Sequence, residues 1–89
     1  MRKIHKYSIP IDTGTIHIPW DYQILKVAGQ RENICLWAVV ETDAASSPMS
    51  FAIVPTGVEP PTPQKGHYLD TVFLNNGALV FHVYMLREE

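Results

Sequence analysis

The chain has almost no cysteine: Cys35 is the only one in its 89 residues. A single thiol cannot form a disulfide within the chain and cannot supply a cysteine-based metal site. Cys35 is flanked by Ile34 and Leu36, which indicates a buried small apolar side chain rather than a nucleophile. The four histidines show no i, i+4 or His-x-His spacing that would form a metal-binding face. We therefore expect no disulfide and no metal, and we also expect no cofactor.

Positive charge is also scarce. Seven Lys and Arg residues against nine Asp and Glu residues give a formal net charge of −2 and a pI near 6.0. A protein that binds extended nucleic acid by neutralising phosphates needs a clear excess of Lys and Arg. The composition therefore argues against an extended nucleic-acid partner.

Long apolar runs are missing as well. No stretch approaches the roughly 20 apolar residues that a membrane-spanning helix needs, and the N-terminal segment lacks the apolar core of a signal peptide. The sequence contains no internal repeat and no helical stripe of apolar residues longer than two turns. We expect a single domain over residues 1–89 that lies in the cytoplasm and has no membrane partner.

The chain does contain short segments rich in Ile, Val, Thr and aromatic residues, separated by turns and polar loops. This pattern predicts β-strands. The predicted strands are residues 3–9, 15–18, 23–28, 34–41, 51–54, 68–74 and 78–86. We expect an all-β fold, namely a small antiparallel sandwich or partly open barrel of about seven strands.

Turn residues predict three hairpins between these strands. Residues 12–14 join the first two strands, residues 29–30 join the third and fourth, and Asn76-Gly77 joins the last two in a type I′ turn. Residues 42–50 are expected to form a polar surface loop. The proline-rich segment 58–65 is expected to be an extended, polyproline-like connector.

Two of the predicted strands are apolar on both faces. In strand 34–41, Leu36 is on one face and Trp37 is on the other. In strand 78–86, Phe81 is on one face and His82 is on the other, among side chains that are otherwise mostly apolar. Such strands are central and covered twice, or they face a partner subunit. Because so short a chain offsets its conformational entropy only narrowly and lacks a disulfide, we expect a homo-oligomer.

One motif has a catalytic precedent. Asp12-Thr13-Gly14 matches the signature of aspartic proteases, in which two carboxylates share a proton and activate a water. The glycine-rich flap and the later apolar segment followed by glycine are missing. Turn chemistry favours an Asx-type turn between two strands. We therefore expect a protein that is not an enzyme, with an aspartic protease dimer as the catalytic alternative.

Several side chains are of the types that bind phosphates and nucleobases. Lysine and arginine bind phosphate, aromatic rings stack on bases, and a hydroxyl followed by glycine can face an anion. A histidine inside an apolar strand is either hydrogen-bonded in the core or lines a pocket. The predicted ligand-binding residues are Lys6, Tyr7, Arg31, Trp37, Thr56 and His82. For Trp37, packing in the core is the competing interpretation.

The order of several segments resembles that of a known family. Lys6-Tyr7-Ser8-Ile9, Leu36-Trp37-Ala38-Val39-Val40 and Ile53-Val54-Pro55-Thr56-Gly57 are followed by Gly77-Ala78-Leu79-Val80-Phe81-His82-Val83. Together they resemble, over nearly the whole length, a family of uncharacterised short accessory proteins of tailed phages and prophages. The resemblance implies a phage accessory gene and carries no assigned activity or site residues.

This resemblance shapes the functional expectation, because small accessory proteins of phages often antagonise host immunity. It implies a non-catalytic binding protein in the host cytoplasm. The first hypothesis is an oligomer that sequesters a nucleotide signal molecule at its subunit interfaces. The alternative is a protein inhibitor of a host defence effector, similar to an anti-CRISPR factor.

Overall fold

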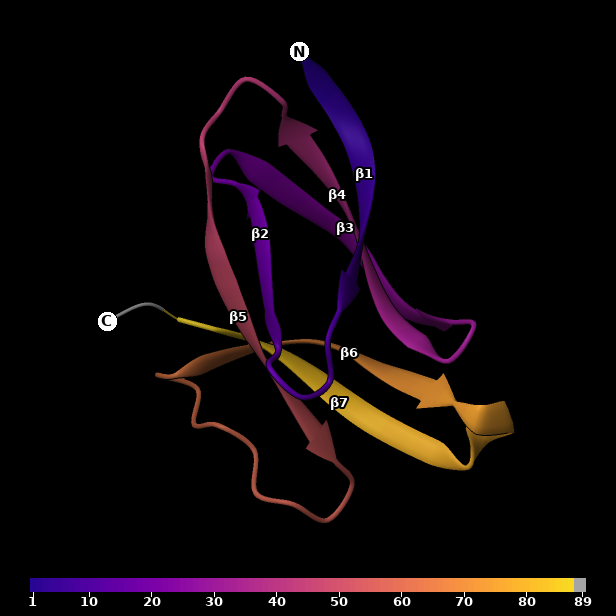
Figure 1. Cartoon of the computed structure of the whole chain (residues 1–89). Coiled ribbons are helices and arrows are strands. Elements are labelled where there is room, and N and C mark those ends of the chain that lie inside the picture. Colours follow the sequence, from indigo (N-terminus) through magenta and orange to yellow (C-terminus); the bar gives the residue numbers. More distant parts are fainter. Residues whose placement is uncertain (88–89) are drawn as a thin grey trace.

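Seven antiparallel strands in two sheets make up the computed structural model, which describes residues 1–87 (Figure 1). The three-stranded sheet has the order β1 (Arg2–Ile9), β4 (Asn33–Glu41), β3 (Tyr22–Gln30). The four-stranded sheet has the order β2 (Thr15–Pro19), β5 (Ser46–Pro55), β7 (Leu79–Leu86), β6 (Gly66–Leu74). The predicted all-β, sandwich-like fold is confirmed, and the two sheets do not close into a barrel.

Strand β5 runs the length of the four-stranded sheet and pairs with a different strand in each half. Residues 46–50 pair with β2, and residues 51–55 pair with β7 (Figure 1). The prediction of a loop over residues 42–50 was therefore wrong for residues 46–50. This half of β5 is a strand because β2 pairs with it and Met49 is buried, although its other side chains are polar. Pro48 is tolerated there because β5 has only one partner strand at that level.

The predicted hairpin between the first two strands was also wrong, because they belong to different sheets. β1 pairs with β4, and β2 pairs with β5. The turn between them is closed by a 2.7 Å hydrogen bond from the Gly14 N–H to the Pro10 carbonyl, and Gly14 has a left-handed φ of 65°. Ile9 and Ile16 on either side of the turn both face the core, which requires the chain to cross between layers.

The β3–β4 hairpin is confirmed, but its turn lies two residues later than predicted. Gly29 pairs with Ile34 inside the ladder, and the turn residues are Arg31 and Glu32, with left-handed φ values of 51° and 65°. The β6–β7 hairpin is confirmed as well. Its turn contains a short 3₁₀ element, η1 (Asn75–Gly77), whose three residues all have positive φ. The predicted Asn76-Gly77 turn is thus extended by one residue.

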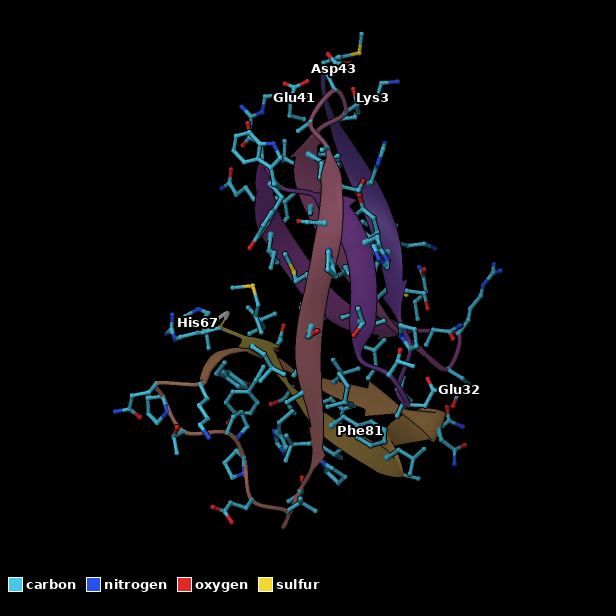
Figure 2. The ribbon with its side chains drawn as sticks, turned by 60° about the vertical axis from the view of Figure 1, so that its left-hand side comes forward. Lys3, Glu32, Glu41, Asp43, His67 and Phe81 are labelled. Atoms are coloured by element: carbon cyan, nitrogen blue, oxygen red, sulfur yellow. The ribbon has the colours of Figure 1, made fainter. Side chains whose placement is uncertain are left out.

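The core lies between the facing sides of the two sheets. Its largest fully buried side chains include Leu36 and Val40 from β4 and Val83 from β7. Phe81 of β7 packs against this cluster at the lower half of the molecule (Figure 2). The predicted central position of β4 and β7 is confirmed, since each has a neighbouring strand on both sides, whereas a partner subunit over their outer faces stays a prediction.

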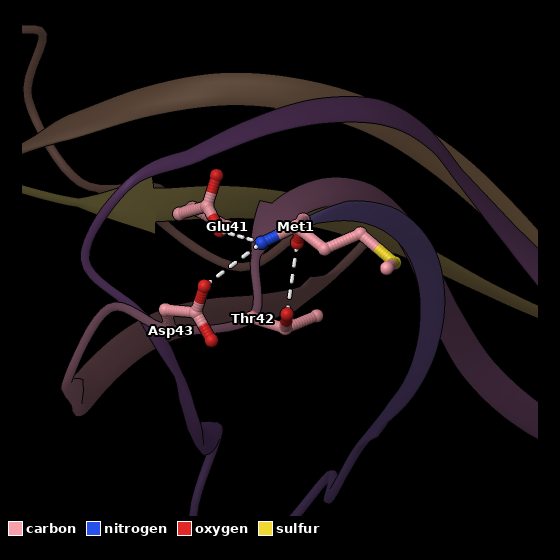
Figure 3. Close-up of polar contacts among 4 residues, drawn as sticks. All are labelled: Met1, Glu41, Thr42 and Asp43. Carbon is pink, nitrogen blue, oxygen red and sulfur yellow. Dashed lines mark hydrogen bonds and ion pairs between the residues drawn. The ribbon is translucent and has the colours of Figure 1, made fainter.

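The N-terminus lies at the end of the molecule opposite to β6 and β7 (Figure 1), and the amino group of Met1 forms a cluster of polar contacts there (Figure 3). This group contacts the Glu41 carboxylate and donates a 3.0 Å hydrogen bond to Asp43, while the Thr42 hydroxyl donates to the Met1 carbonyl at 2.8 Å. The ammonium holds the pKa of the Glu41 carboxyl below its ordinary value, and Glu41 in turn raises the pKa of the ammonium. These contacts join the start of β1 to the end of β4.

Candidate functional site

The outer face of the three-stranded sheet carries a tryptophan between two lysines. In the β1–β4 ladder Lys6 lies directly opposite Trp37, and in the β3–β4 ladder Lys26 lies opposite the same residue. Residues directly opposite each other in an antiparallel ladder project from the same face. The three side chains therefore lie in one row across three strands. Trp37 is half-buried, whereas both lysines are exposed.

A β-bulge places Lys26 in this row. The β3–β4 register shifts between Ile24 and Lys26, so that Leu25 is the extra residue. Without that shift, Lys26 would lie opposite Leu36, whose side chain is fully buried in the core. The bulge therefore turns Lys26 outward and allows Val27 to face the core.

The charges of the molecule are distributed unevenly between the sheets. Five of the seven Lys and Arg residues lie in the three-stranded sheet and its β3–β4 turn, where Glu32 and Glu41 are the only acidic residues. The five are Arg2, Lys3, Lys6, Lys26 and Arg31. Lys6 Nζ donates a 2.8 Å hydrogen bond to Gln30 Oε1 on the same face. Of the five, Arg2, Lys6 and Lys26 lie on the outer face, where Glu41 is the acidic residue, so this face can attract an anion although the chain as a whole is acidic.

The structure brings together only part of the predicted site. Tyr7 follows Lys6 in β1 and projects from the opposite face, where it packs against the core, and burial raises the pKa of its hydroxyl. Arg31 lies in the β3–β4 turn, beyond the last pair of the ladder, Gln30 and Asn33, and is outside the lysine and tryptophan row. Thr56 and His82 belong to the other sheet and its connector.

His82 lies in a chain of hydrogen bonds on the outer face of the four-stranded sheet. Its Nε2 is 2.8 Å from Thr56 Oγ1, and its Nδ1 is 2.9 Å from Thr71 Oγ1, which is 2.6 Å from the Tyr68 hydroxyl. When the imidazole is neutral, the four groups carry one such hydrogen each, four in total. The three hydrogen bonds of the chain use three of them. One terminal hydroxyl, that of Thr56 or of Tyr68, therefore keeps a hydrogen that it can donate to a ligand.

The connector between β5 and β6 closes over this part of the sheet. Pro61 packs so closely on Gly66 that a Cβ atom there would lie 2.7 Å from Pro61 Cγ, and the Tyr84 Cβ is 3.5 Å from the same point. Beside this contact, a hollow of about 250 Å³ is lined by Thr56, His82 and Tyr84 among others. The connector lies on the surface as predicted, and Pro61 packs against Gly66 at the start of β6.

Asp12 lies in the turn between β1 and β2. The motif lies in a turn that joins two strands, as predicted, but the turn is not of the Asx type. Asp12 Oδ1 accepts a 2.8 Å hydrogen bond from the N–H of the next residue, Thr13, and the Gly14 N–H donates to the Pro10 carbonyl instead. Within residues 1–87, no group of three or more His, Cys, Asp and Glu side chains is arranged to hold a metal ion. No helix in the same range is long and apolar enough to cross a membrane.

The whole chain, residues 1–89, matches a protein family described as a domain of unknown function, DUF7352. The chain belongs to the DUF7352 family. No curated protein and no solved structure matches it. The expected membership of an uncharacterised family, over the full length, is thus confirmed for this DUF7352 chain, and its phage origin stays a prediction.

Sequence reasoning missed three polar residues of this DUF7352 protein: Lys26, Tyr68 and Thr71. The inward-facing Ile24 and Val27 are three residues apart, which breaks the two-residue period of a strand and is a signal for the bulge that exposes Lys26. Tyr68 and Thr71 join His82 only through the register of β6 and β7, which a second bulge between Tyr68 and Asp70 sets. No local pattern indicates that contact.

Proposed function

We propose that this protein is a non-catalytic binding protein that holds a nucleotide on the outer face of its three-stranded sheet. The observation that carries the proposal is the position of Trp37 in one row with Lys6 and Lys26. An indole ring stacks on a nucleobase, and ammonium groups on either side neutralise phosphate oxygens. One aromatic ring with two neighbouring cations suits a single nucleotide better than a strand.

We further propose that copies of the chain associate beside this row. Ile4 is 62% exposed and lies opposite the half-buried Val39 on the same outer face, so both add apolar surface next to Trp37. Burying this surface against a second copy would remove apolar area from water and partly enclose the nucleotide. Native mass spectrometry of the purified protein reports the assembly and any retained nucleotide together.

The biological role that we propose is the sequestration of a nucleotide signal of host immunity, in the cytoplasm of a host cell. It is supported by the resemblance to phage accessory proteins and by a face suited to holding a ligand. Sequestration needs affinity and no turnover. It also requires that the bound nucleotide be released unchanged when the protein is denatured.

Isothermal titration calorimetry against cyclic and linear nucleotides tests the binding proposal. Base stacking on an aromatic side chain is worth about 1–3 kcal/mol, so Trp37→Leu is expected to weaken binding by roughly 5-fold to 150-fold. Lys6→Ala and Lys26→Ala are expected to weaken binding of a nucleotide but not of the matching nucleoside. Lys3→Ala is the matched control, because Lys3 lies opposite the inward-facing Val40 and is not in the row.

A fluorescence titration provides a second measurement. In a Trp20→Phe background Trp37 is the only tryptophan, and a base stacked on it is expected to quench its emission. Absence of both heat and quenching across the nucleotide panel at micromolar concentrations would contradict the proposal. Equal loss of affinity in Lys3→Ala and Lys6→Ala would show a diffuse charge effect instead of this site.

A further inference from the structure

Strand β1 forms an open edge of the three-stranded sheet, with β4 on one side and, within residues 1–87, no strand on the other (Figure 1). Its eight residues pair with β4 in one unbroken register, without a bulge or a proline. Residues 2–6 are all exposed. A regular and exposed edge of this length can form hydrogen bonds with a further strand.

The backbone groups that face this open edge can be assigned from one hydrogen bond. The Thr42 N–H donates to the Met1 carbonyl at 2.9 Å, so the backbone groups of Met1 point toward the β4 side. Hydrogen-bonded and non-hydrogen-bonded pairs alternate along an antiparallel ladder, so the direction of these groups alternates as well. In β1 the residues whose N–H and C=O groups point away from β4 are therefore Arg2, Ile4, Lys6 and Ser8.

Two open edges of the four-stranded sheet carry a proline. The Phe51 N–H donates a 2.7 Å hydrogen bond to the Gly14 carbonyl, which fixes the alternation in the β2–β5 ladder. By this alternation, the nitrogens of Pro19 in β2 and Pro48 in β5 point away from the ladder. Proline has no N–H to donate, so each of these edges lacks a donor that a further strand would need.

The edges of β3 and β6 are protected in a different way. The turns that follow these strands meet, and the Glu32 carboxylate accepts a 3.1 Å hydrogen bond from the Asn75 N–H there. Toward their other ends the two strands line a groove of about 500 Å³, and each carries a β-bulge in this part. Bulges interrupt the regular row of backbone groups at an edge. Within residues 1–87, β1 is therefore the edge best suited to pairing.

The sequence of β1 is complementary to itself in one antiparallel register. Hydrogen bonds across such a seam form between residues whose backbone groups face it. One register pairs all four of these residues, because Arg2 lies opposite Ser8 and Ile4 lies opposite Lys6, with His5 opposite itself at the two-fold axis. A shift of two residues in either direction would place Arg2 opposite Lys6, or Lys6 opposite itself, and like charges directly opposite each other are destabilising.

We propose that β1 pairs with β1 of a second copy in this register, which joins two three-stranded sheets into one sheet of six strands. On the outer face, Ile4 of the second copy then lies beside Lys6, at the end of the row that contains Trp37. The Lys6 side chains of the two copies become diagonal neighbours across the seam, where one anion can contact both. This inference rests on the proposed association of copies and not on nucleotide binding.

Amide hydrogen exchange tests the seam on the unaltered protein. At about 1 mM protein, the Ile4 and Lys6 amides are expected to exchange at least about fivefold more slowly than unstructured amides, and this protection should fall on dilution to about 1 μM. The His17 amide is the control, because it points to the open edge of β2 and lies outside the seam. Unprotected exchange of Ile4 and Lys6 at about 1 mM, or protection that does not change on dilution, would overturn the proposal.

Disulfide cross-linking tests the register. In the proposed pairing the two His5 Cα atoms are about 4.5 Å apart, which is within the range that a disulfide spans. With oxidised glutathione, His5→Cys is therefore expected to form covalent dimers at least about tenfold faster than Lys3→Cys, whose two thiols would be about 13 Å apart along the seam. Cys35 is buried and does not take part. Equal rates for the two variants would refute this register.

Two substitutions at Ile4 separate backbone pairing from side-chain contact. Ile4→Pro removes an N–H that points to the seam and no hydrogen bond to β4, so it is expected to weaken association at least about tenfold and to keep the fold. Ile4→Ala keeps this N–H and is the control, which should weaken association less. Equal effects in sedimentation velocity would mean that the side chain joins the copies and that the proposed ladder does not.

Calorimetry with the nucleotide panel distinguishes failure of this inference from failure of the proposed function. A protein that binds a nucleotide while its Ile4 and Lys6 amides stay unprotected refutes the β1 seam and keeps the nucleotide site. A protein that pairs through β1 and binds no nucleotide supports the seam and refutes the nucleotide site.

Discussion

Gly29 of β3 lies against the backbone of Phe73 in β6. A Cβ atom on Gly29 would be 2.7 Å from the Phe73 carbonyl oxygen and 2.8 Å from Leu74 Cδ2. At this point the edges of the two sheets touch, although no ladder joins them. Glycine is required there by the close approach of the strands, and the groove opens on the far side of this contact.

We predict that Gly29→Ala destabilises the fold. The added methyl group must displace backbone, and overpacking of this kind costs about 1–3 kcal/mol. Urea denaturation of the purified protein measures the change in unfolding free energy. Gln64→Ala, in the exposed connector, is the control and should stay within about 0.5 kcal/mol of the original protein. A neutral Gly29→Ala would mean that the sheets can separate at this point without cost.

The contrast between Ile34 and Ile4 gives a second prediction. Ile34 is fully buried in β4, whereas Ile4 in the neighbouring β1 is 62% exposed. Ile34→Ala is expected to lower the unfolding free energy by about 2–5 kcal/mol, because it removes buried apolar atoms and leaves a cavity. Ile4→Ala should cost less than about 1 kcal/mol in the monomer. A larger loss for Ile4→Ala that grows with protein concentration would indicate its burial between copies.

Local patterns predicted the strands whose pairing is regular. Alternation in residues 34–40 placed Leu36 and Val40 on one face of the strand, which the structure shows to be the buried face, and the β6–β7 hairpin followed from Asn76 and Gly77. The polar half of β5 was missed because residues 46–50 are a strand only through their pairing with β2, which is distant in sequence. The sheet assignment of β1 and β2 depends in the same way on long-range partners.

In the candidate site too, contacts set by regular pairing could be predicted, and contacts set by bulges or packing could not. Lys6 and Trp37 are brought together by a regular ladder, and their shared face could be predicted once β1 and β4 were paired. Lys26 joins them only because a bulge reverses its direction. Thr56 lies beside His82 because the connector returns over the sheet, and this contact depends on packing rather than on local alternation.

The hydrogen-bond chain through His82 gives a third prediction. The chain has three hydrogen bonds, and Thr71→Val removes the two that Thr71 forms with Tyr68 and His82. Thr71 is half-buried, and valine keeps the β-branched shape of its side chain. The substitution is expected to lower the unfolding free energy by about 1–2 kcal/mol. Thr56→Val removes one bond at an exposed position and should cost about 0.5 kcal/mol. Equal effects in urea denaturation would argue against a chain centred on Thr71.

A fourth prediction concerns the pH dependence of the contact between Met1 and Glu41. The pKa of Glu41 is lower in the folded protein than its ordinary value of 4.5, so the contact stabilises the fold above that pH. This stabilisation is lost as the pH falls through the lowered pKa. The pKa of the Met1 ammonium is raised above 8.0, so the contact is also lost as the pH rises through that raised value. NMR titration of the Glu41 carboxyl measures the shift.

Two variants test whether this contact causes the shift. Glu41→Gln should remove the loss of stability below pH 4.5 that this contact causes and should reduce the loss above pH 8.0, where Asp43 still holds the ammonium. Glu59→Gln, on the exposed connector, should leave both losses unchanged. Asp43→Asn removes one partner of the ammonium and should move its pKa part of the way back toward 8.0. An unshifted Glu41 titration would show that the pair does not persist in solution.

The packing of Pro61 on Gly66 gives the last prediction. Gly66→Ala would place a Cβ atom 2.7 Å from Pro61 Cγ, so the proline must move and the connector must loosen from Tyr84. Lys65 is exposed and precedes Gly66 in the same turn, so trypsin can report this loosening. A local cost of about 1–2 kcal/mol corresponds to roughly 5-fold to 30-fold faster cleavage after Lys65.

Gly77→Ala is the control that separates local loosening from general destabilisation, because Gly77 has a φ of +88° and no neighbouring atom within 4 Å of an added Cβ. It should destabilise the β6–β7 turn through backbone strain while leaving the connector packed. If both variants accelerate cleavage after Lys65 equally at matched global stability, the connector is held by the fold as a whole and not by the proline.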